Sequence, residues 1–341
     1  MNMIHPLALT SDQWASSLFA LFGRGRQQAL ALYKTIFRHG SIRDGLPEFA
    51  NAPKLFEAMS SKVCLTLYPI AQLKEDGQTV RFLLKTPDGH LIESVLITMQ
   101  HGKTICVSSQ IGCRMGCRFC QTGTLGLIRH LSVDEIIQQV FVARHILKVP
   151  VNNVVFMGMG EPFDNYEAVC QAVRILQDPI GLSIGARHIS ISTSGDIEGI
   201  KRFSLESFVR PNLTVSINAP NDELRRELMP YRRKEPLAAL YEAMKSYSRH
   251  TGRIVYTSYV LLGGINDRME YAEELAAYLE GLSTRVNLIP YNQVSTKGFC
   301  PPTKESLSGF MEALRSRHIP VFLRNEKGGA IDAACGQLGF Y

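Results

Sequence analysis

The sequence predicts an α/β fold, namely a partial (β/α)6 barrel with a small N-terminal helical domain and a β-hairpin extension. Three observations predict it. From about residue 104 onward, short apolar runs alternate with amphipathic helical segments, a pattern typical of parallel βα units. Six such units can be counted, fewer than the eight of a closed barrel. Residues 1–78 lack this alternation and show helical periodicity instead.

Length and composition indicate a globular protein with one large and one smaller domain. Of 341 residues, 45% are hydrophobic and 20% are charged, as in ordinary water-soluble domains. Eight cysteines without a secretory leader favour the reducing cytoplasm, where thiols serve metals and catalysis. No segment is long and apolar enough to cross a bilayer. The net charge of +6 suits a polyanionic partner such as RNA.

The N-terminal segment is expected to form a helical accessory domain over residues 1–78, followed by the barrel domain over 79–341. Helical periodicity covers 11–22 and 25–37, and Pro53 interrupts the helical signal at 46–62. Basic side chains on this segment form either a solvated face or a surface that contacts RNA; they are Arg24, Arg26, Lys34, Arg38 and Arg43.

Residues 79–99 are predicted to form a β-hairpin. Apolar positions alternate on both sides of Pro87-Asp88-Gly89, and such a turn between two alternating runs is typical of a hairpin.

The barrel units follow in order along the chain. The predicted strands are 104–112, 151–162, 188–195, 213–220, 254–264 and 286–292. The predicted helices are 132–147, 165–178, 196–207, 237–252, 269–282 and 305–318. Ser132 followed by Glu135 is a helix-start signal. Ligands of such folds bind at the carboxyl ends of the strands, and an open barrel would admit a macromolecular substrate.

A loop with three cysteines follows the first predicted barrel strand. Cys113, Cys117 and Cys120 lie within eight residues of one another, so three soft thiolates can share one metal centre. A structural zinc ion takes four ligands, whereas a [4Fe–4S] cluster held by three thiolates keeps one iron open. The spacing therefore favours the cluster, with a zinc loop that recruits a distant fourth ligand as the alternative. Glycines that let the loop bend stand at Gly112, Gly116 and Gly123.

Polar or glycine-rich sequences also end four predicted strands. They are GMGEP at 158–162, STSG at 192–195, SINAP at 216–220 and PYN at 290–292. Glycine allows close backbone approach, while Glu, Ser and Asn offer hydrogen bonds to amino, hydroxyl and carboxylate groups. Four such ends at one barrel mouth predict a small-molecule site next to the cysteine loop.

Taken together, the motifs resemble those of the RlmN/Cfr family of radical S-adenosylmethionine (SAM) RNA (adenine) methyltransferases. The similar motifs are ICVSSQIGC, the cysteine loop with its aromatic Phe119, GMGEP, STSG, APNDELRRELMP, GGIND, VNLIPYN and IDAACGQL. The resemblance covers about residues 80–340, and GRGRQQALALYKTIF is similar to the family's N-terminal domain.

This resemblance implies an enzyme that uses a [4Fe–4S] cluster and SAM to methylate an adenine ring carbon in 23S rRNA. Carbon 2 is the commoner outcome in the family, whereas the tail IDAACGQLGFY is closer to the carbon 8 branch, and both stay open. It further implies a monomeric cytoplasmic protein, an electron donor such as flavodoxin, and tRNA as an open second substrate. A non-catalytic or differently targeted RNA-binding paralogue is the rival interpretation.

The resemblance also assigns roles to individual positions. Cys113, Cys117 and Cys120 would bind the cluster. The residues that would bind SAM are Gly160, Glu161, Ser192, Ser216, Ile217, Asn218 and Asn292. Cys335 would become S-methylated, Cys106 would be the second catalytic cysteine, and Glu93 would be the proton acceptor. Asn218 replaces a histidine usual in the family, and Gln293 replaces a proline.

The family mechanism needs two cysteines with different surroundings. A first SAM methylates Cys335, and a radical derived from a second SAM then activates that methyl group for addition to the ring. Cys106 attacks Cys335, which releases the product and leaves a disulfide. Cys335 stands in a Gly-rich tail that we expect to be mobile.

A basic run near the fourth strand has two interpretations. Arg225, Arg226 and the run Arg232, Arg233 and Lys234 form either a solvated face or a contact for RNA phosphates.

Overall fold

A ten-stranded, mostly parallel sheet organises the molecule, as the computed structural model shows for residues 3–100, 102–231, 235–294, 298–324 and 327–339. Its first four strands pair antiparallel: β1 (Ile70–Asp76), β2 (Thr79–Lys85), β3 (Leu91–Met99) and β4 (Gly102–Cys106). From β4 onward the neighbours run parallel: β7 (Val151–Phe156), β8 (Ile189–Thr193), β9 (Asn212–Ser216), β10 (Val255–Leu261), β11 (Thr284–Pro290) and β12 (Val321–Leu323). The predicted α/β class is confirmed.

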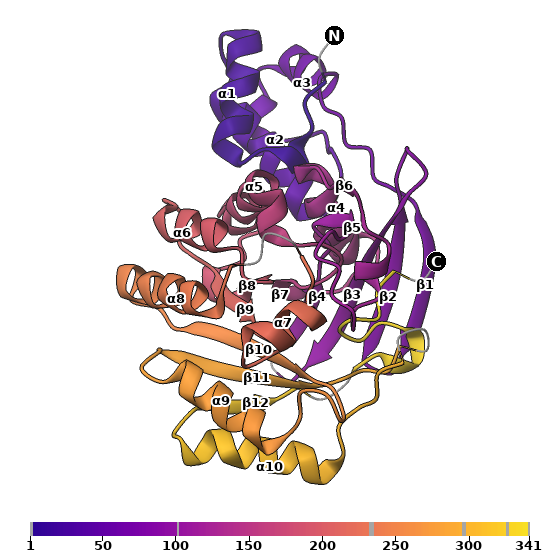
Figure 1. Cartoon of the computed structure of the whole chain (residues 1–341). Coiled ribbons are helices and arrows are strands. Elements are labelled where there is room, and N and C mark those ends of the chain that lie inside the picture. The colour runs from indigo at the N-terminus through magenta and orange to yellow at the C-terminus, as the bar shows by residue number, and fades with distance from the viewer. Residues whose placement is uncertain (1–2, 101, 232–234, 295–297, 325–326, 340–341) are drawn as a thin grey trace.

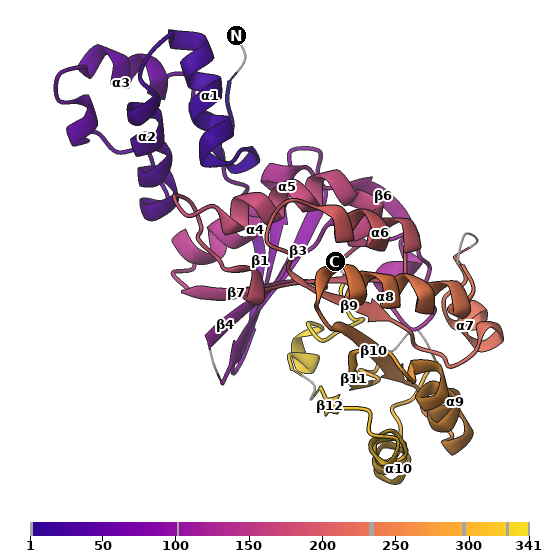
Figure 2. The ribbon, with the colours of Figure 1, turned by 90° about the vertical axis from the view of Figure 1, so that its left-hand side faces the viewer.

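Helices cover the outer side of the curved sheet (Figures 1 and 2). They are α4 (Val133–His145), α5 (Tyr166–Gln177), α6 (Ile197–Leu205), α8 (Leu237–Thr251), α9 (Met269–Leu279) and α10 (Lys304–Ser316), while the short helix α7 (Asp222–Leu228) lies at the carboxyl ends of β8 and β9. Glu135 accepts a hydrogen bond from the Ser132 backbone N–H at 2.9 Å, which caps α4 as predicted. Each described helix is too short or too polar to cross a lipid bilayer.

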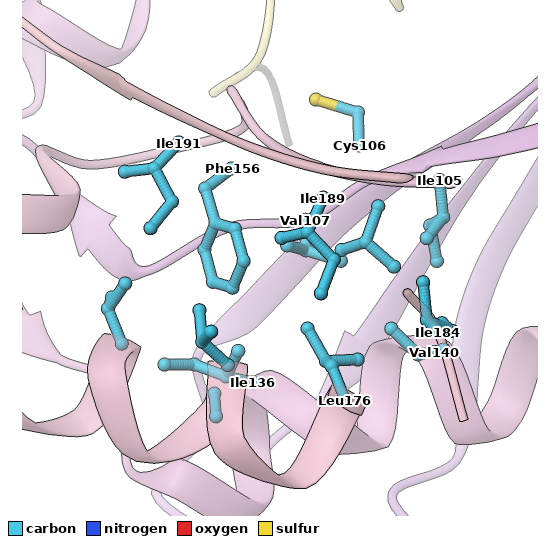
Figure 3. Packing of buried hydrophobic residues seen from close by; sticks show 14 of the residues in the cluster. Ile105, Cys106, Val107, Ile136, Val140, Phe156, Leu176, Ile184, Ile189 and Ile191 are labelled. Carbon is cyan, nitrogen blue, oxygen red and sulfur yellow. The ribbon is translucent and has the colours of Figure 1, made fainter. Parts of the chain in front are cut away.

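Alternation along the strands sorts side chains between the helices and the barrel interior (Figure 3). Ile105, Val107 and Phe156 face the helices and pack against residues such as Ile136. Cys106 points to the opposite side of the sheet from its neighbour Ile105. The strand therefore buries its aliphatic residues and turns its one thiol toward the inside of the barrel.

The predicted hairpin is present and extended by a further strand. β2 and β3 pair in antiparallel register across the turn at Pro87-Asp88-Gly89, and Gly89 has a φ of +88° that suits glycine. The sequence analysis missed β1 because nearly all of its residues are exposed, so it lacks an apolar period. It also missed β12, which has only three residues.

The first predicted barrel strand is divided. β4 ends at Cys106, and β5 (Gln110–Gly112) pairs with β6 (Leu127–His130) in a separate two-stranded sheet. The interruption lies at Ser108, whose hydroxyl donates to the Glu93 carbonyl at 2.7 Å. This hydrogen bond holds the chain against the hairpin just before β5, and β5 leads into the cysteine loop.

The N-terminal helices α1 (Ser11–Phe22), α2 (Arg26–His39) and α3 (Pro53–Ser60) confirm the predicted helical segments. They pack beside α4 and α5, on the side of the molecule away from α9 and α10 (Figures 1 and 2). The ring of Phe37 contacts that of Phe141, with 5.8 Å between centroids, and His145 Nε2 lies 3.0 Å from the Phe37 carbonyl. β1 lies before the predicted boundary at residue 78 and pairs with β2 after it, so this boundary stays a prediction.

Candidate active site

A cavity opens at the carboxyl ends of the parallel strands and brings most of the predicted site residues together. Those that line it are Cys113, Cys117, Cys120, Gly160, Glu161, Ser192, Ser216, Asn218 and Cys335. Three come from the cysteine loop, five from the ends of β7, β8 and β9, and one from the C-terminal tail. Residues far apart in the sequence thus share one cavity, as expected at the strand ends of such a fold.

The cysteine loop is folded tightly at its start. Gly112 has a φ of +74°, and a Cβ built there would lie 1.9 Å from the carbonyl oxygen of Gly126. The next residue, Cys113, donates its backbone N–H to that same oxygen at 2.8 Å. A Cβ on Gly123 would lie 2.9 Å from the Cys117 carbonyl oxygen. Only glycine fits at these two positions, so the loop can hold its three thiols toward the cavity.

The thiols in this loop suit a multi-iron centre. Burial raises the pKa of Cys113 above its ordinary value, and the nearby Cys117 and Cys120 raise it further. A cationic centre would reverse this effect, because metal coordination favours the thiolate. Over the described residues, no three His, Cys, Asp or Glu side chains surround a single ion position. Three thiols on one cavity fit a [4Fe–4S] cluster, which has one thiolate on each coordinated iron.

Glu161 presents a buried carboxylate to the cavity. It is 4% exposed, and its two oxygens accept the backbone N–H groups of Ser194 at 2.7 Å and Phe163 at 3.2 Å. Burial raises its pKa despite these hydrogen bonds. The neighbouring Gly160 approaches Gln110 so closely that a Cβ would lie 2.6 Å from the Gln110 Cβ. The GMGEP loop is thereby fixed against β5, with a carboxylate positioned to accept hydrogen bonds from an amino group.

Arg225 links two of the strand ends. It is 2% exposed and donates to the carbonyl oxygens of Ser194 at 2.9 Å and Ile217 at 3.3 Å. Burial lowers its pKa to about 10. The prediction that Arg225 is a solvated or phosphate-binding side chain is therefore wrong, because α7 turns it inward, while Arg226 is exposed. The rest of that basic run, Arg232 to Lys234, lies outside the described residues.

Asn218 has a structural task in addition to lining the cavity. Its φ is +58°, a conformation that Asn tolerates better than most residues. Its side-chain oxygen accepts the backbone N–H of Val260 at 2.9 Å, which joins the ends of β9 and β10. The Ile217 side chain is buried in the core, so a contact from this residue to SAM would involve its backbone and stays a prediction.

A second cavity adjoins the first and contains both predicted catalytic cysteines. Cys106 and Cys335 line it, with Cys335 and Cys120 shared between the two cavities. Burial raises the pKa of Cys106, and the proximity of Cys335 raises it further. The guanidinium of Arg324, which lines both cavities, opposes this increase. No disulfide joins any cysteines of the described residues.

The C-terminal tail is tied to the barrel around Cys335. The Cys335 carbonyl accepts the side-chain amide of Asn292 at 3.0 Å, and the Gly336 carbonyl accepts the Gln121 N–H at 2.7 Å. Thr122 Oγ1 donates to the Leu338 carbonyl at 2.6 Å. Asn292 lines the second cavity, and its predicted contact with SAM remains untested. The mobility predicted for this tail also stays a prediction.

Glu93 is not among the described residues that line either cavity. It is fully buried, and Arg81 Nη2 lies 2.5 Å from its Oε1. Its other oxygen accepts the Gly339 N–H at 3.2 Å. Burial raises the pKa of Glu93, while Arg81 opposes the rise. Its role as proton acceptor stays a prediction.

The sequence analysis missed Arg81 and Arg324 as functional candidates, and it assigned Arg225 to a solvated or phosphate-binding surface instead of a buried structural position. One signal could have found the first: in the hairpin register Arg81 pairs with Val95 and Glu93 lies two residues earlier, so the two charges are diagonal neighbours on one face. No comparable signal exists for Arg225 or Arg324, because their partners come from distant segments.

Comparison with known proteins places the chain in a family. The model of the radical SAM superfamily matches residues 107–278. A probable dual-specificity RNA methyltransferase RlmN 1 of Protochlamydia amoebophila is 47% identical over 98% of this chain and 93% of its own. The corresponding RlmN protein of Geobacillus kaustophilus is 40% identical over 97% of this chain and 91% of its own.

The fold has a close match among solved structures. A radical SAM methyltransferase from Sphaerobacter thermophilus aligns with a TM-score of 0.90, 38% sequence identity and 99% coverage of each chain. The similarity therefore includes the N-terminal helices, the hairpin and the tail as well as the barrel.

Proposed function

The chain belongs to the RlmN-type radical SAM RNA methyltransferases, and we propose that it methylates an adenine ring carbon in 23S rRNA through an S-methylcysteine. The family establishes the reaction class, RNA as substrate, and SAM and a [4Fe–4S] cluster as cofactors. The ring position, carbon 2 or carbon 8, and the cysteine intermediate are our proposal. One observation supports it above all: Cys335 lines the cavity of the cluster cysteines and also the cavity that contains Cys106.

The cavity residues can be assigned to parts of the cofactors. Cys113, Cys117 and Cys120 would hold the cluster. When bound, the cluster supplies the electron for reductive cleavage of SAM, from which the hydrogen-abstracting radical arises. Glu161 would accept hydrogen bonds from the SAM amino group, alongside the close backbone approach at Gly160. Hydroxyls and amides for the rest of SAM would come from Ser192, Ser216, Ile217, Asn218 and Asn292.

Cys335 and Cys106 would carry the two sulfur steps. The Cys335 thiolate attacks the SAM methyl carbon, so that a sulfur–carbon bond forms while the bond from that carbon to the SAM sulfur breaks. After this carbon is joined to the adenine ring and Glu93 has taken the ring proton, the Cys106 thiolate attacks the Cys335 sulfur. A disulfide forms, the carbon–sulfur bond breaks, and its electron pair stays on the carbon bound to the ring, which takes up a proton and so becomes the methyl group.

The position of Arg324 supports these roles of Cys335 and Cys106, because its charge lies near both thiols, and both must ionise. A thiolate is the reactive form of cysteine, and burial opposes ionisation of Cys106, whereas Cys335 is exposed. The Arg324 charge favours ionisation of each. Its backbone N–H donates to the Leu288 carbonyl at 2.9 Å, which fixes its position directly after the edge strand β12.

RNA would reach this site from the open side of the barrel. We assign contacts with RNA phosphates to the basic N-terminal segment, to the exposed Arg226, and to the run from Arg232 to Lys234 outside the described residues. We further propose that the protein acts as a cytoplasmic monomer, that a flavodoxin-type protein donates electrons, and that tRNA is a second candidate substrate.

The two cysteines are tested by separate alanine variants purified from cells. Cys106→Ala should still methylate Cys335 and then stall as a covalent protein–RNA adduct, visible as a ribonuclease-sensitive band in denaturing electrophoresis. Cys335→Ala and the double variant should lose methyl transfer and form no adduct. An adduct with Cys335→Ala would reverse the roles, and full activity of both variants would refute the two-cysteine mechanism.

Mass spectrometry of rRNA from cells with and without the gene then assigns the carbon that receives the methyl group. The non-catalytic alternative would gain support if the reconstituted, reduced protein failed to cleave SAM.

A further inference from the structure

We propose that Arg81 and Glu93 form a buried clasp that holds the C-terminal tail in place and so positions Cys335 in the active site. Arg81 is thereby assigned a positioning role. The importance of Cys335 rests on the proposed function above, whereas the clasp itself is a structural claim that can be tested without catalysis.

The clasp contacts the tail on both sides of Cys335. Arg81 Nη1 donates to the carbonyl oxygen of Ile331 at 3.3 Å, and Glu93 Oε2 accepts the backbone N–H of Gly339 at 3.2 Å. The two tail residues lie four positions before and four positions after Cys335. The Arg81–Glu93 pair joins these anchor points at 2.5 Å, so one pair of side chains closes the tail segment at its two ends.

The first residues of the tail also contact the hairpin strands β2 and β3. Gly328 has a φ of +76°, and a Cβ there would lie 2.7 Å from the Thr79 side chain. Lys327 Nζ donates to the Thr98 carbonyl at 3.0 Å on the adjacent strand. These contacts show that the described part of the tail packs along β2 and β3, which the yellow segment beside the hairpin in Figure 1 also shows.

Burial makes this pair an effective anchor. Arg81 and Glu93 are 1% and 0% exposed, and a buried charge is costly unless its hydrogen bonds are satisfied. Hydrogen bonds to charged groups are stronger than those between neutral groups. Release of the tail would remove a backbone partner from each of the two charges, so the charges favour the attached state.

This role differs from proton transfer by Glu93, and the two roles make separate predictions. A base acts on the reacting ring, whereas a clasp acts on the position of the tail before any RNA binds. Arg81 acts on proton transfer only through its ion pair with Glu93, whereas its replacement changes tail exchange in the absence of RNA only if the clasp exists.

Amide hydrogen exchange of the intact protein, followed by mass spectrometry, measures the attachment of the tail directly. The variants are Arg81→Gln, Glu93→Gln and the double variant Arg81→Met/Glu93→Leu, which leaves no unpaired buried charge and so protects the fold. Arg174→Gln, which removes an ion pair with Glu206 elsewhere, is the matched control. Exchange in β7 to β10 serves as an internal measure of global stability.

We expect the clasp variants to raise exchange of the amides at 331–339 by about tenfold or more, as loss of a hydrogen bond to a charged group predicts. In the clasp variants the amides of the barrel strands should exchange at the wild-type rate. The amides of the Arg174→Gln control should also exchange at the wild-type rate. The double variant should exceed the larger single effect only slightly, because the two side chains act as one unit.

Diamide oxidation of the apoprotein provides a second readout. Formation of the Cys106–Cys335 disulfide should slow by about tenfold in the clasp variants, because a released tail lowers the effective concentration of one thiol near the other.

Unchanged tail exchange in a folded double variant would overturn the proposal, as would a rise that only parallels the barrel strands. Loss of methylation by Glu93→Gln with normal tail exchange would assign Glu93 to proton transfer alone and also refute the clasp. If wild-type Cys335 were never methylated, the proposed function would fail while the exchange results would still decide the clasp.

Discussion

Gly112→Ala tests whether backbone geometry at the start of the cysteine loop controls cluster binding. Gly112 has a φ of +74°, and the new Cβ would lie 1.9 Å from the Gly126 carbonyl oxygen. That oxygen also accepts the Cys113 N–H at 2.8 Å. The substitution should therefore displace the first ligand of the proposed cluster.

The expected destabilisation has two parts. Left-handed backbone costs a residue with a Cβ about 1–2 kcal/mol, and loss of the Cys113 hydrogen bond costs about 1 kcal/mol more. The sum is about 2–3 kcal/mol in the free energy of unfolding. Gly126→Ala is the matched control, because Gly126 has a φ of +63° and no atom lies within 4 Å of its added Cβ. The Gly126→Ala variant should therefore lose only the cost of left-handed backbone, about 1–2 kcal/mol.

Two measurements test this prediction. Urea unfolding compares the two alanine variants with wild type, and iron and sulfide analysis after anaerobic reconstitution measures cluster content. Cys113→Ala, which removes a proposed ligand, gives the lower limit for iron. The reasoning is refuted if Gly112→Ala loses no more stability and no more iron than Gly126→Ala.

Two further predictions concern buried cations and pH. Arg225→Met removes the donor shared by the Ser194 and Ile217 carbonyls, so it should destabilise the fold by about 2–4 kcal/mol. It should also raise the Kd for SAM, which calorimetry measures. An unchanged Kd would contradict a link between this arginine bridge and the cavity. His145 donates to the Phe37 carbonyl from a partly buried position, and this burial lowers its pKa below the ordinary 6.5. Its stabilising contribution is thus full above pH 6.5 and lost as the pH falls through the lowered value, so urea midpoints should decline between pH 7 and 5 in wild type and less in His145→Gln. Equal slopes in the two proteins would refute this assignment.

The sequence by itself determined the features that depend on neighbouring residues. The hairpin followed from one turn and the alternation on either side of it, and the helices from their apolar period and caps. Cys113, Cys117 and Cys120 are close in the chain, so any compact loop brings them near one another. The strand ends could be grouped because parallel βα units place their carboxyl ends on one edge.

The family motifs added expectations that the sequence pattern could not supply on physical grounds alone. They indicated Cys106 and Cys335 as partners, although nothing local connects a strand end with a distant tail. The tertiary structure brings the two thiols to one cavity. It also gives Asn292 a hydrogen bond to the Cys335 carbonyl, a contact that no motif specifies.

Only the tertiary structure decided which charges are buried and what they bind. Arg225 stands in a run that looks solvated, yet its partners are carbonyl groups at two strand ends. Arg81 and Glu93 face Ile331 and Gly339, which lie more than two hundred residues further along the chain. Such contacts depend on how the whole chain closes on itself. A local pattern carries no information on them, because long-range pairing is fixed by packing rather than by neighbouring residues.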